Sequence, residues 1–228
     1  MGMDRAVVLL SGGMDSATLL GYVVRELAVS RVYALSFRYG QKHTRELETA
    51  RWQAQAAGVA EHREADLTAL GDLTAPASAL TGAARPVPDL RDLTAAERRQ
   101  PPTYVPHRNL AFLSLAAAYA EAVGAADVFY GAQAQDEYGY WDCTAEFVAR
   151  LNRLLALNRG RPVTIHAPFA AKSKADVLAL GLRLGVDFAR TWSCYRGQAK
   201  PCGTCPSCVE RAAAFRKAGA PDPLAVSI

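Results

Sequence analysis

Residues 6–16 carry the feature that most constrains the fold, an apolar run followed at once by a glycine turn and a helical pattern. The apolar residues 6–10 include two β-branched side chains and predict a short strand buried on both faces. Two glycines break the run, and Asp15 or Ser16 is expected to cap a helix that continues through Val24. Such a turn is an anion site, because free backbone N–H groups and the helix dipole both point at it.

The motif in this turn reads Ser-Gly-Gly-x-Asp-Ser and contains neither G-x-G-x-x-G nor the lysine of the G-x-x-x-x-G-K-[ST] loop. An ordinary strand-to-helix turn is the alternative interpretation. The motif resembles the pyrophosphate loop of the ATP pyrophosphatase superfamily, whose enzymes cleave ATP between the α and β phosphates. The ATP-binding residues that this resemblance implies are Leu10, Ser11, Gly12, Gly13, Met14, Asp15 and Ser16.

Further apolar runs alternate with helical patterns along the chain. Strands are expected at residues 32–37, 62–65, 127–130 and 163–165, and helices at residues 44–57, 110–123, 147–157 and 172–184. This alternation predicts parallel pairing with right-handed crossovers. The expected fold class is α/β, an open doubly wound parallel sheet with helices on both faces, similar to the adenine-nucleotide α-hydrolases.

The 228 residues suffice for one α/β domain and a small appendage. Residues 1–190 are expected to form the ATP-binding domain, and residues 191–228 a small C-terminal zinc-binding region. Residues 67–103 are rich in proline and lack periodicity. A long irregular segment of this kind is either a functional flap over the site or disordered, and we expect the flap.

The polar loop after the strand at 127–130 concentrates carboxylates and aromatic rings, at the strand end where open α/β sheets bind ligands. It favours a planar, hydrogen-bonding substrate over a plain surface loop. Lys174 stands at the start of a helix, where a cation opposes the dipole. A nearby anion explains its position better than solvent exposure does.

Four of the five cysteines fall close together near the C-terminus with the spacing C-x7-C-x2-C-x2-C. They are Cys194, Cys202, Cys205 and Cys208. Thiolates at this spacing hold a tetrahedral Zn²⁺, and four sulfur ligands leave no open position, so a structural role is expected. An iron–sulfur cluster is the alternative, although the ferredoxin-type continuation x3-C-P is missing here. Cys143 stands apart, near the expected substrate loop.

Taken together, the motifs resemble those of the 7-cyano-7-deazaguanine synthases over nearly the whole chain. The motifs that carry the resemblance are the loop at 11–16, Val-Pro-His-Arg-Asn at 105–109, the segment 136–143, Lys-Ala-Asp at 174–176, Leu-Gly-Val-Asp at 184–187, Thr-Trp-Ser-Cys-Tyr at 191–195, and Cys-Gly-Thr-Cys-Pro-Ser-Cys at 202–208. Two positions depart from the pattern of many relatives. Trp141 replaces a proline, and His107 replaces a glycine.

The resemblance implies that ATP and ammonia convert 7-carboxy-7-deazaguanine first to the amide and then to the nitrile, each stage passing through an adenylate. It implies catalytic roles for Asp15, Ser16, Lys174 and Arg108. It implies substrate contacts from Arg108, Asn109, Asp136, Tyr140, Trp141 and Asp142, with Tyr140 and Trp141 flanking the ring and the aspartates at its guanine-like edge. One structural Zn²⁺, Mg²⁺ bound with ATP, and a homodimer complete the expectation.

Other functions are also considered. The net charge of +4 permits an anionic substrate and does not demand a nucleic acid. No apolar run approaches the roughly 20 residues that span a bilayer, and a cytoplasmic location is expected. The alternatives are an amide-forming deazaguanine ligase, a tRNA-thiolating enzyme with the same loop, and a zinc-knuckle module that binds nucleic acid.

Overall fold

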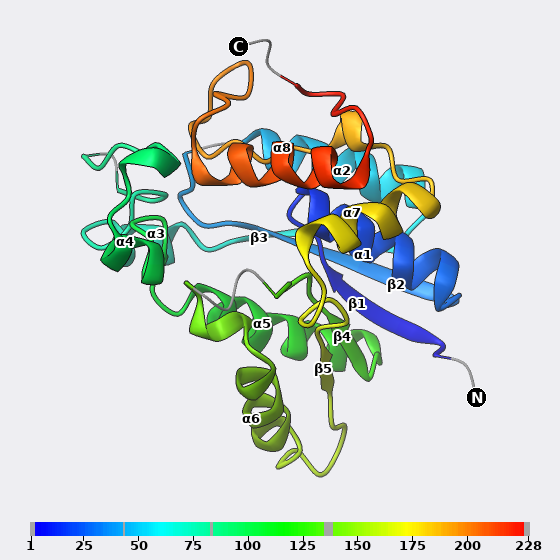
Figure 1. The fold of residues 1–228 in the computed structure, drawn as a ribbon. Helices are drawn as coiled ribbons and strands as arrows, with labels where there is room; N and C mark the ends of the chain where they lie inside the picture. The colour runs from blue at the N-terminus through cyan, green and yellow to red at the C-terminus, as the bar shows by residue number, and fades with distance from the viewer. Residues whose placement is uncertain (1–2, 43, 83, 135–138, 226–228) are drawn as a thin grey trace.

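The computed structural model describes residues 3–42, 44–82, 84–134 and 139–225. Its centre is a five-stranded sheet in the order β3-β2-β1-β4-β5, in which all pairs are parallel (Figure 1). The strands are β1 (Arg5–Leu9), β2 (Arg31–Arg38), β3 (Glu61–Asp66), β4 (Asp127–Phe129) and β5 (Thr164–His166). The predicted parallel sheet is confirmed. The chain order reverses between β1 and β4, which is where doubly wound sheets bind ligands.

Helices cover both faces of this sheet (Figure 1). The helices are α1 (Met14–Gly21), α2 (Arg45–Ala57), α3 (Thr68–Thr74), α4 (Ala95–Arg99), α5 (Arg108–Val123), α6 (Ala145–Leu155), α7 (Lys174–Arg183) and α8 (Pro206–Ala218). A π-helical turn at Tyr22–Glu26 extends α1. Helices α1, α2, α7 and α8 lie on one side of the sheet, and α5 lies on the other. The expected α/β class with helices on both faces is confirmed.

Strand β1 is apolar because both of its faces are covered. Val7 faces α5 and shares a core with Leu113 and Ala117. Ala6 and Val8 point the opposite way, into the core under α1 and α2. All three β1 side chains have no exposed area. The edge strand β3 is polar and half-buried or exposed throughout, since it has a neighbour on only one side.

Local signals explain most helix ends. Gly58 and Gly124 adopt left-handed conformations, with φ of 65° and 70°, and end α2 and α5 as expected. Ser173 and Asp176 form a capping box at the start of α7. The expected cap of α1 is wrong. That helix begins at Met14 after Gly13, and Gly13 has no side chain to donate or accept a capping bond.

Residues 67–103 contain more regular structure than the sequence indicated, since α3 and α4 both lie within them. At the other end of the chain, α8 was not predicted. Pro206 at its first turn and Gly219 at its end are the signals that mark it. Trp192, Cys194, Cys205 and Cys208 pack in the same core as β1 and α5. The boundary expected near residue 190 stays a prediction.

Among the described residues, no helix is both long and apolar enough to cross a membrane.

Candidate active site

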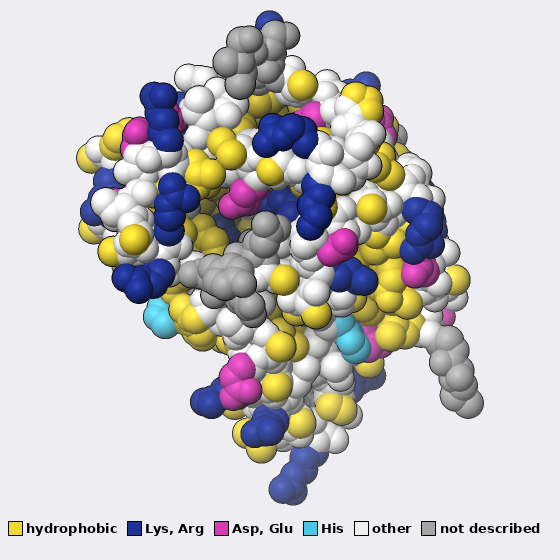
Figure 2. All heavy atoms as spheres, in the orientation of Figure 1, with side chains coloured by type: hydrophobic (Ala, Val, Ile, Leu, Met, Phe, Trp, Pro, Cys, Tyr) yellow, Lys and Arg dark blue, Asp and Glu magenta, His cyan; other side chains and the backbone are white. Residues whose placement is uncertain are grey.

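A cavity of about 450 Å³ opens at the carboxyl ends of β1, β2 and β4. The phosphate-loop motif, the aromatic residues after β2, the start of α5, Lys174 and α8 all contribute to its wall. Leu80, Leu90, Leu93, Arg98, Pro101 and Thr103 bring the expected flap to the same cavity. Figure 2 shows the opening as a hollow with acidic and basic side chains visible inside it and further Lys or Arg side chains around its mouth.

Hydroxyl groups fix the shape of the loop. The backbone N–H of Ser11 donates to Oγ of Ser16 at 3.2 Å, and the two hydroxyl oxygens are 3.0 Å apart. The N–H of Gly13 donates to Oγ of Ser11, and the Ser16 hydroxyl donates to the Gly13 carbonyl, each at 3.2 Å. The two serines are therefore bonded to the loop itself. Leu10, Gly13, Met14 and Asp15 line the cavity with them.

Gly12 joins the loop to α2 and to Trp192. Its carbonyl accepts hydrogen bonds from the Thr49 hydroxyl, the Gln53 amide and the Trp192 N–H, at 3.1, 3.1 and 3.0 Å. Its φ is +83°, and a Cβ there would overlap the backbone of α2. Gly12 lies outside the cavity wall. It allows α2 to approach the loop.

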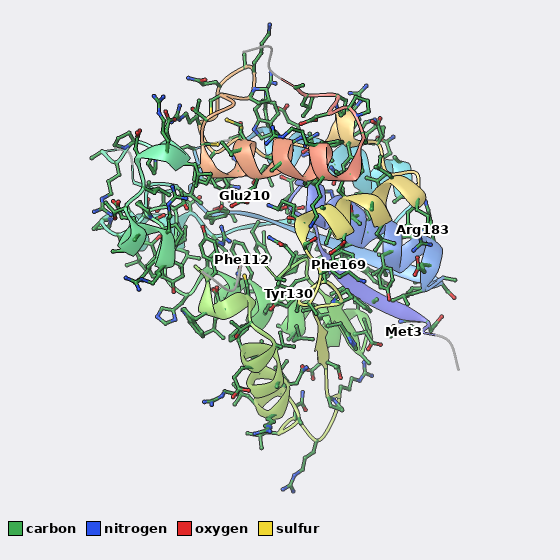
Figure 3. All side chains as sticks on the ribbon, in the orientation of Figure 1. Met3, Phe112, Tyr130, Phe169, Arg183 and Glu210 are labelled. Atoms are coloured by element: carbon green, nitrogen blue, oxygen red, sulfur yellow. The ribbon has the colours of Figure 1, made fainter. Side chains whose placement is uncertain are left out.

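Asp15 and Lys174 meet on the cavity wall, and Glu210 from α8 joins them. The ammonium Nζ of Lys174 lies 2.9 Å from Oε2 of Glu210 and 3.7 Å from Oδ2 of Asp15. Burial raises the pKa of Asp15, and the charge of Lys174 opposes that rise. Oδ1 of Asp15 is buried and has no hydrogen-bond partner in the described part of the chain. Figure 3 labels Glu210, which lies on the cavity side of α8.

Arg108 also lines the cavity, where it lies against aromatic rings that form an aromatic wall. Its guanidinium carbon lies 5.6 Å from the ring centre of Tyr39 and 5.9 Å from that of Phe112. Nη1 donates to the Tyr39 hydroxyl at 3.4 Å. The rings of Phe112 and Phe37 stack at 4.2 Å. Phe112 of α5 and Tyr130 after β4 are labelled near the same region in Figure 3. A cation on an apolar platform suits a planar anion.

Asn109 and Tyr140 also line the cavity. The Tyr140 hydroxyl lies 3.0 Å from the Thr103 hydroxyl, which joins the 139–143 segment to the flap. Cys143 is buried in the cavity wall, and the Asn109 amide donates to its sulfur at 3.2 Å.

Two expected substrate contacts lie elsewhere. Asp142 is 2% exposed and accepts hydrogen bonds from Asn109, so it does not line the cavity. Burial raises its pKa, against the opposing charge of Arg108. Trp141 is 46% exposed and packs edge-on against His107 and Phe147, outside the cavity wall. Asp136 lies outside the described residues.

The four C-terminal cysteines converge. Their Sγ atoms all lie within 4.8 Å of one another, in a site that could hold a metal ion. A tetrahedral ion with Zn–S bonds of about 2.3 Å requires sulfur atoms about 3.8 Å apart. Those of Cys202 and Cys208 are 4.0 Å apart. The N–H groups of Cys202 and Cys205 donate to sulfur atoms of the same group, which favours thiolates. The cluster therefore fits one small cation.

Sequence reasoning did not find Glu210, Tyr39 or Phe112. The helix signals around α8 could have placed Glu210 one turn beyond Pro206, on a helix leaving the cysteine cluster. Tyr39 follows β2 directly, so its place at the carboxyl edge of the sheet could have been inferred. Nothing local distinguishes Phe112 from the core residues of α5.

Comparison with known proteins identifies the family to which the chain is similar. The model described as "Queuosine biosynthesis protein QueC" matches residues 5–219. The 7-cyano-7-deazaguanine synthase of Chromohalobacter salexigens is 47% identical over 96% of this chain and 85% of the relative. Those of Caldicellulosiruptor saccharolyticus and Thermoplasma acidophilum are 46% and 43% identical, each over 98% of this chain and over 96% and 92% of the relative.

Solved structures show the fold. The U34-tRNA thiolase NcsA from Methanococcus maripaludis, solved with its [4Fe-4S] cluster, matches 95% of this chain and 66% of its own, with a TM-score of 0.52 and 15% identity. NMN synthetase from Francisella tularensis matches 99% of this chain and 79% of its own, with a TM-score of 0.50 and 16% identity. The similarity to the curated synthases is far stronger and spans nearly the full length. The chain therefore belongs to the QueC family of queuosine biosynthesis proteins.

Proposed function

We propose that this chain converts 7-carboxy-7-deazaguanine to 7-cyano-7-deazaguanine with ATP and ammonia. The observation that carries the proposal is a single cavity that joins the phosphate-loop motif to the Arg108 wall. Family membership supplies the substrate class. ATP on the loop and a planar carboxylate on the wall would place a substrate oxygen near the α-phosphate.

ATP phosphates bind at the free N–H groups of the first turn of α1, where the helix dipole adds positive charge. Lys174 lies beside this turn and offsets charge on the leaving pyrophosphate. Asp15 fits a Mg²⁺ bound with ATP, because its Oδ1 is buried without a partner. When bound, Mg²⁺ would supply positive charge for the departing phosphates. The hydroxyl groups of Ser11 and Ser16 hold the loop in shape at the start of this helix.

The guanidinium of Arg108 pairs with the substrate carboxylate, with Tyr140 and Asn109 on the same wall. A carboxylate oxygen attacks the α-phosphorus, pyrophosphate leaves, and ammonia displaces AMP to give the amide. The amide oxygen then attacks the α-phosphorus of a second ATP, and a second pyrophosphate leaves. Loss of AMP and of the nitrogen protons leaves the nitrile.

We further propose that the cysteine cluster holds one Zn²⁺ in a structural role. Each thiolate of a four-iron cluster binds a separate iron atom, so the four sulfurs must stand further apart than around a single ion. The separation of at most 4.8 Å supports the single ion. Four sulfur ligands leave no position for a substrate.

A homodimer and a cytoplasmic location are also proposed. Leu154 in the last turn of α6 and Leu157 just after that helix are 60% and 75% exposed, which is apolar surface available to a second copy. Sedimentation at several protein concentrations tests the dimer.

The mass of the product tests the function. We expect ATP, Mg²⁺, ammonium and 7-carboxy-7-deazaguanine to give the nitrile, with pyrophosphate and AMP released. An amide as the final product would instead indicate an amide-forming ligase. Ser11→Ala and Asp15→Asn should each leave the fold intact and reduce pyrophosphate release by about 10²–10³-fold, since groups that act at a developing anion are worth about 3–4 kcal/mol. Near-normal release by either variant would remove that residue from the phosphate site.

A further inference from the structure

Trp141 is joined to the segment that leads into α5. Its indole Nε1–H donates to the Tyr104 hydroxyl at 2.8 Å. The backbone N–H of His107 donates to the same oxygen at 3.2 Å. The rings of Trp141 and His107 meet edge-on, with centres 5.6 Å apart. Trp141 thus holds His107 through its ring and, by way of Tyr104, through its backbone.

His107 needs such support. It is the residue before α5 and has φ of 55° and ψ of 19°, a left-handed conformation unfavourable for a residue with a Cβ. Its side chain makes no capping hydrogen bond to the helix. Without outside contacts, the first turn of α5 would be free to adopt a more relaxed backbone.

Asp142 supplies the missing cap from the neighbouring position. Oδ2 accepts the backbone N–H of Asn109 at 3.1 Å, and Oδ1 accepts its side-chain amide at 3.3 Å. Trp141 therefore contacts the residue immediately before Arg108 through its ring, and Asp142 bonds the residue immediately after it.

We propose that Trp141 and Asp142 are positioning residues for Arg108. They fix the backbone on both sides of it and so aim its guanidinium across the aromatic wall. We call these contacts of Trp141 and Asp142 the clamp. The side chain of Arg108 contacts the Tyr39 hydroxyl, the Tyr39 and Phe112 rings and the Asn109 amide oxygen, while its backbone N–H donates to the Val105 carbonyl at 3.2 Å. The inference rests on the proposed pairing of Arg108 with the substrate carboxylate.

This arrangement has a consequence for the two stages of the reaction. The first stage uses a charged carboxylate, and the second uses a neutral amide. A misplaced guanidinium weakens the interaction with the carboxylate more than that with the amide, because hydrogen bonds between charged groups are about twice as strong. Loss of the clamp should therefore act selectively on the first stage, whereas a general loss of stability would affect both.

Trp141→Phe tests the clamp, since it removes the N–H donor and keeps a ring against His107. We expect kcat/KM for 7-carboxy-7-deazaguanine to fall about three- to tenfold, the effect of one lost hydrogen bond. With 7-amido-7-deazaguanine supplied as the substrate, kcat/KM should fall only about two- to threefold, because an interaction half as strong loses half as much free energy. Tyr104→Phe removes the acceptor and should give the same selectivity. The double variant should be no worse than Tyr104→Phe alone.

Trp52→Phe is the matched control, because Trp52 is a partly exposed tryptophan on α2, outside the cavity wall. It should change neither constant. Arg108→Ala supplies the reference and should itself be selective for the carboxylate. In the Arg108→Ala background, Trp141→Phe should cost nothing further.

The outcomes distinguish the carboxylate role of Arg108 from the clamp. If Arg108→Ala impairs both substrates equally or neither, the proposed carboxylate role of Arg108 is wrong, and the clamp with it. If Arg108→Ala is selective while Trp141→Phe and Tyr104→Phe leave both constants unchanged, only the clamp is overturned. An equal loss from Trp141→Phe with and without Arg108 would also overturn it.

Discussion

Replacing Gly12 by alanine tests how the phosphate loop is held. A Cβ at this position would overlap the Glu46 carbonyl and the Thr49 hydroxyl and lie 2.9 Å from the Ala50 nitrogen. The left-handed backbone adds about 1–2 kcal/mol for a residue with a Cβ. Moving α2 away adds about 1–3 kcal/mol of strain and weakens hydrogen bonds worth about 1 kcal/mol each. We expect the free energy of unfolding to fall by roughly 3–6 kcal/mol.

Gly58 is the matched control, because its φ is +65° and nothing lies within 4 Å of a Cβ there. Gly58→Ala should lower the free energy of unfolding only by the cost of the left-handed backbone, about 1–2 kcal/mol. Urea unfolding of both variants gives the two values. The difference between them isolates the close approach of α2 to the loop. Equal losses in the two variants would refute this reasoning, and so would a Gly12→Ala variant that binds ATP with unchanged affinity.

Three further predictions follow from the structure. Cys202→Ser should lower both the zinc content, expected at one ion per chain by elemental analysis, and the melting temperature, while Cys143→Ser keeps the metal; a brown protein containing iron and acid-labile sulfide would contradict the zinc assignment. Glu210→Gln should lower the KM for ATP a few-fold, because Lys174 is released from its 2.9 Å ion pair; a higher KM would show that Glu210 itself helps to hold ATP or its metal. Burial lowers the pKa of His62, so its contribution to the free energy of unfolding should be complete above the unfolded pKa of about 6.5 and fall as pH drops toward the folded pKa. Urea unfolding at pH 5.5 and 7.5 should therefore show a smaller loss of stability at the lower pH for His62→Gln than for the unchanged protein. An identical pH dependence of the two proteins would contradict this role of His62.

The sheet could be predicted because its signals are local. Buried apolar runs at β1 and β2, and glycines at the ends of α2 and α5, identify elements without knowledge of their neighbours. Edge strand β3 was the weakest prediction, since a strand with one neighbour can remain polar.

The cavity could be predicted only in part. The loop motif and Lys174 were found because they sit at the ends of elements. The expected stacking of Trp141 on the substrate was based on the spacing of aromatic residues in a loop, and that spacing does not tell which of the rings face the ligand. Its partner Tyr104 lies 37 residues away in the sequence. Glu210 escaped notice for the same reason, because its ion pair with Lys174 exists only once α7 and α8 pack together.

The three hydrogen bonds to the Gly12 carbonyl also bear on when this protein becomes active during synthesis. Two donors come from α2, which leaves the ribosome early, but the third is Trp192, near the other end of the chain. Contacts between distant parts of a sequence form late in folding. A nascent chain that has completed β1, β2 and α2 would still lack the last support of its phosphate loop. The motif that is translated first should thus be among the last to gain its nucleotide-binding shape, which would protect an unfinished enzyme from consuming ATP.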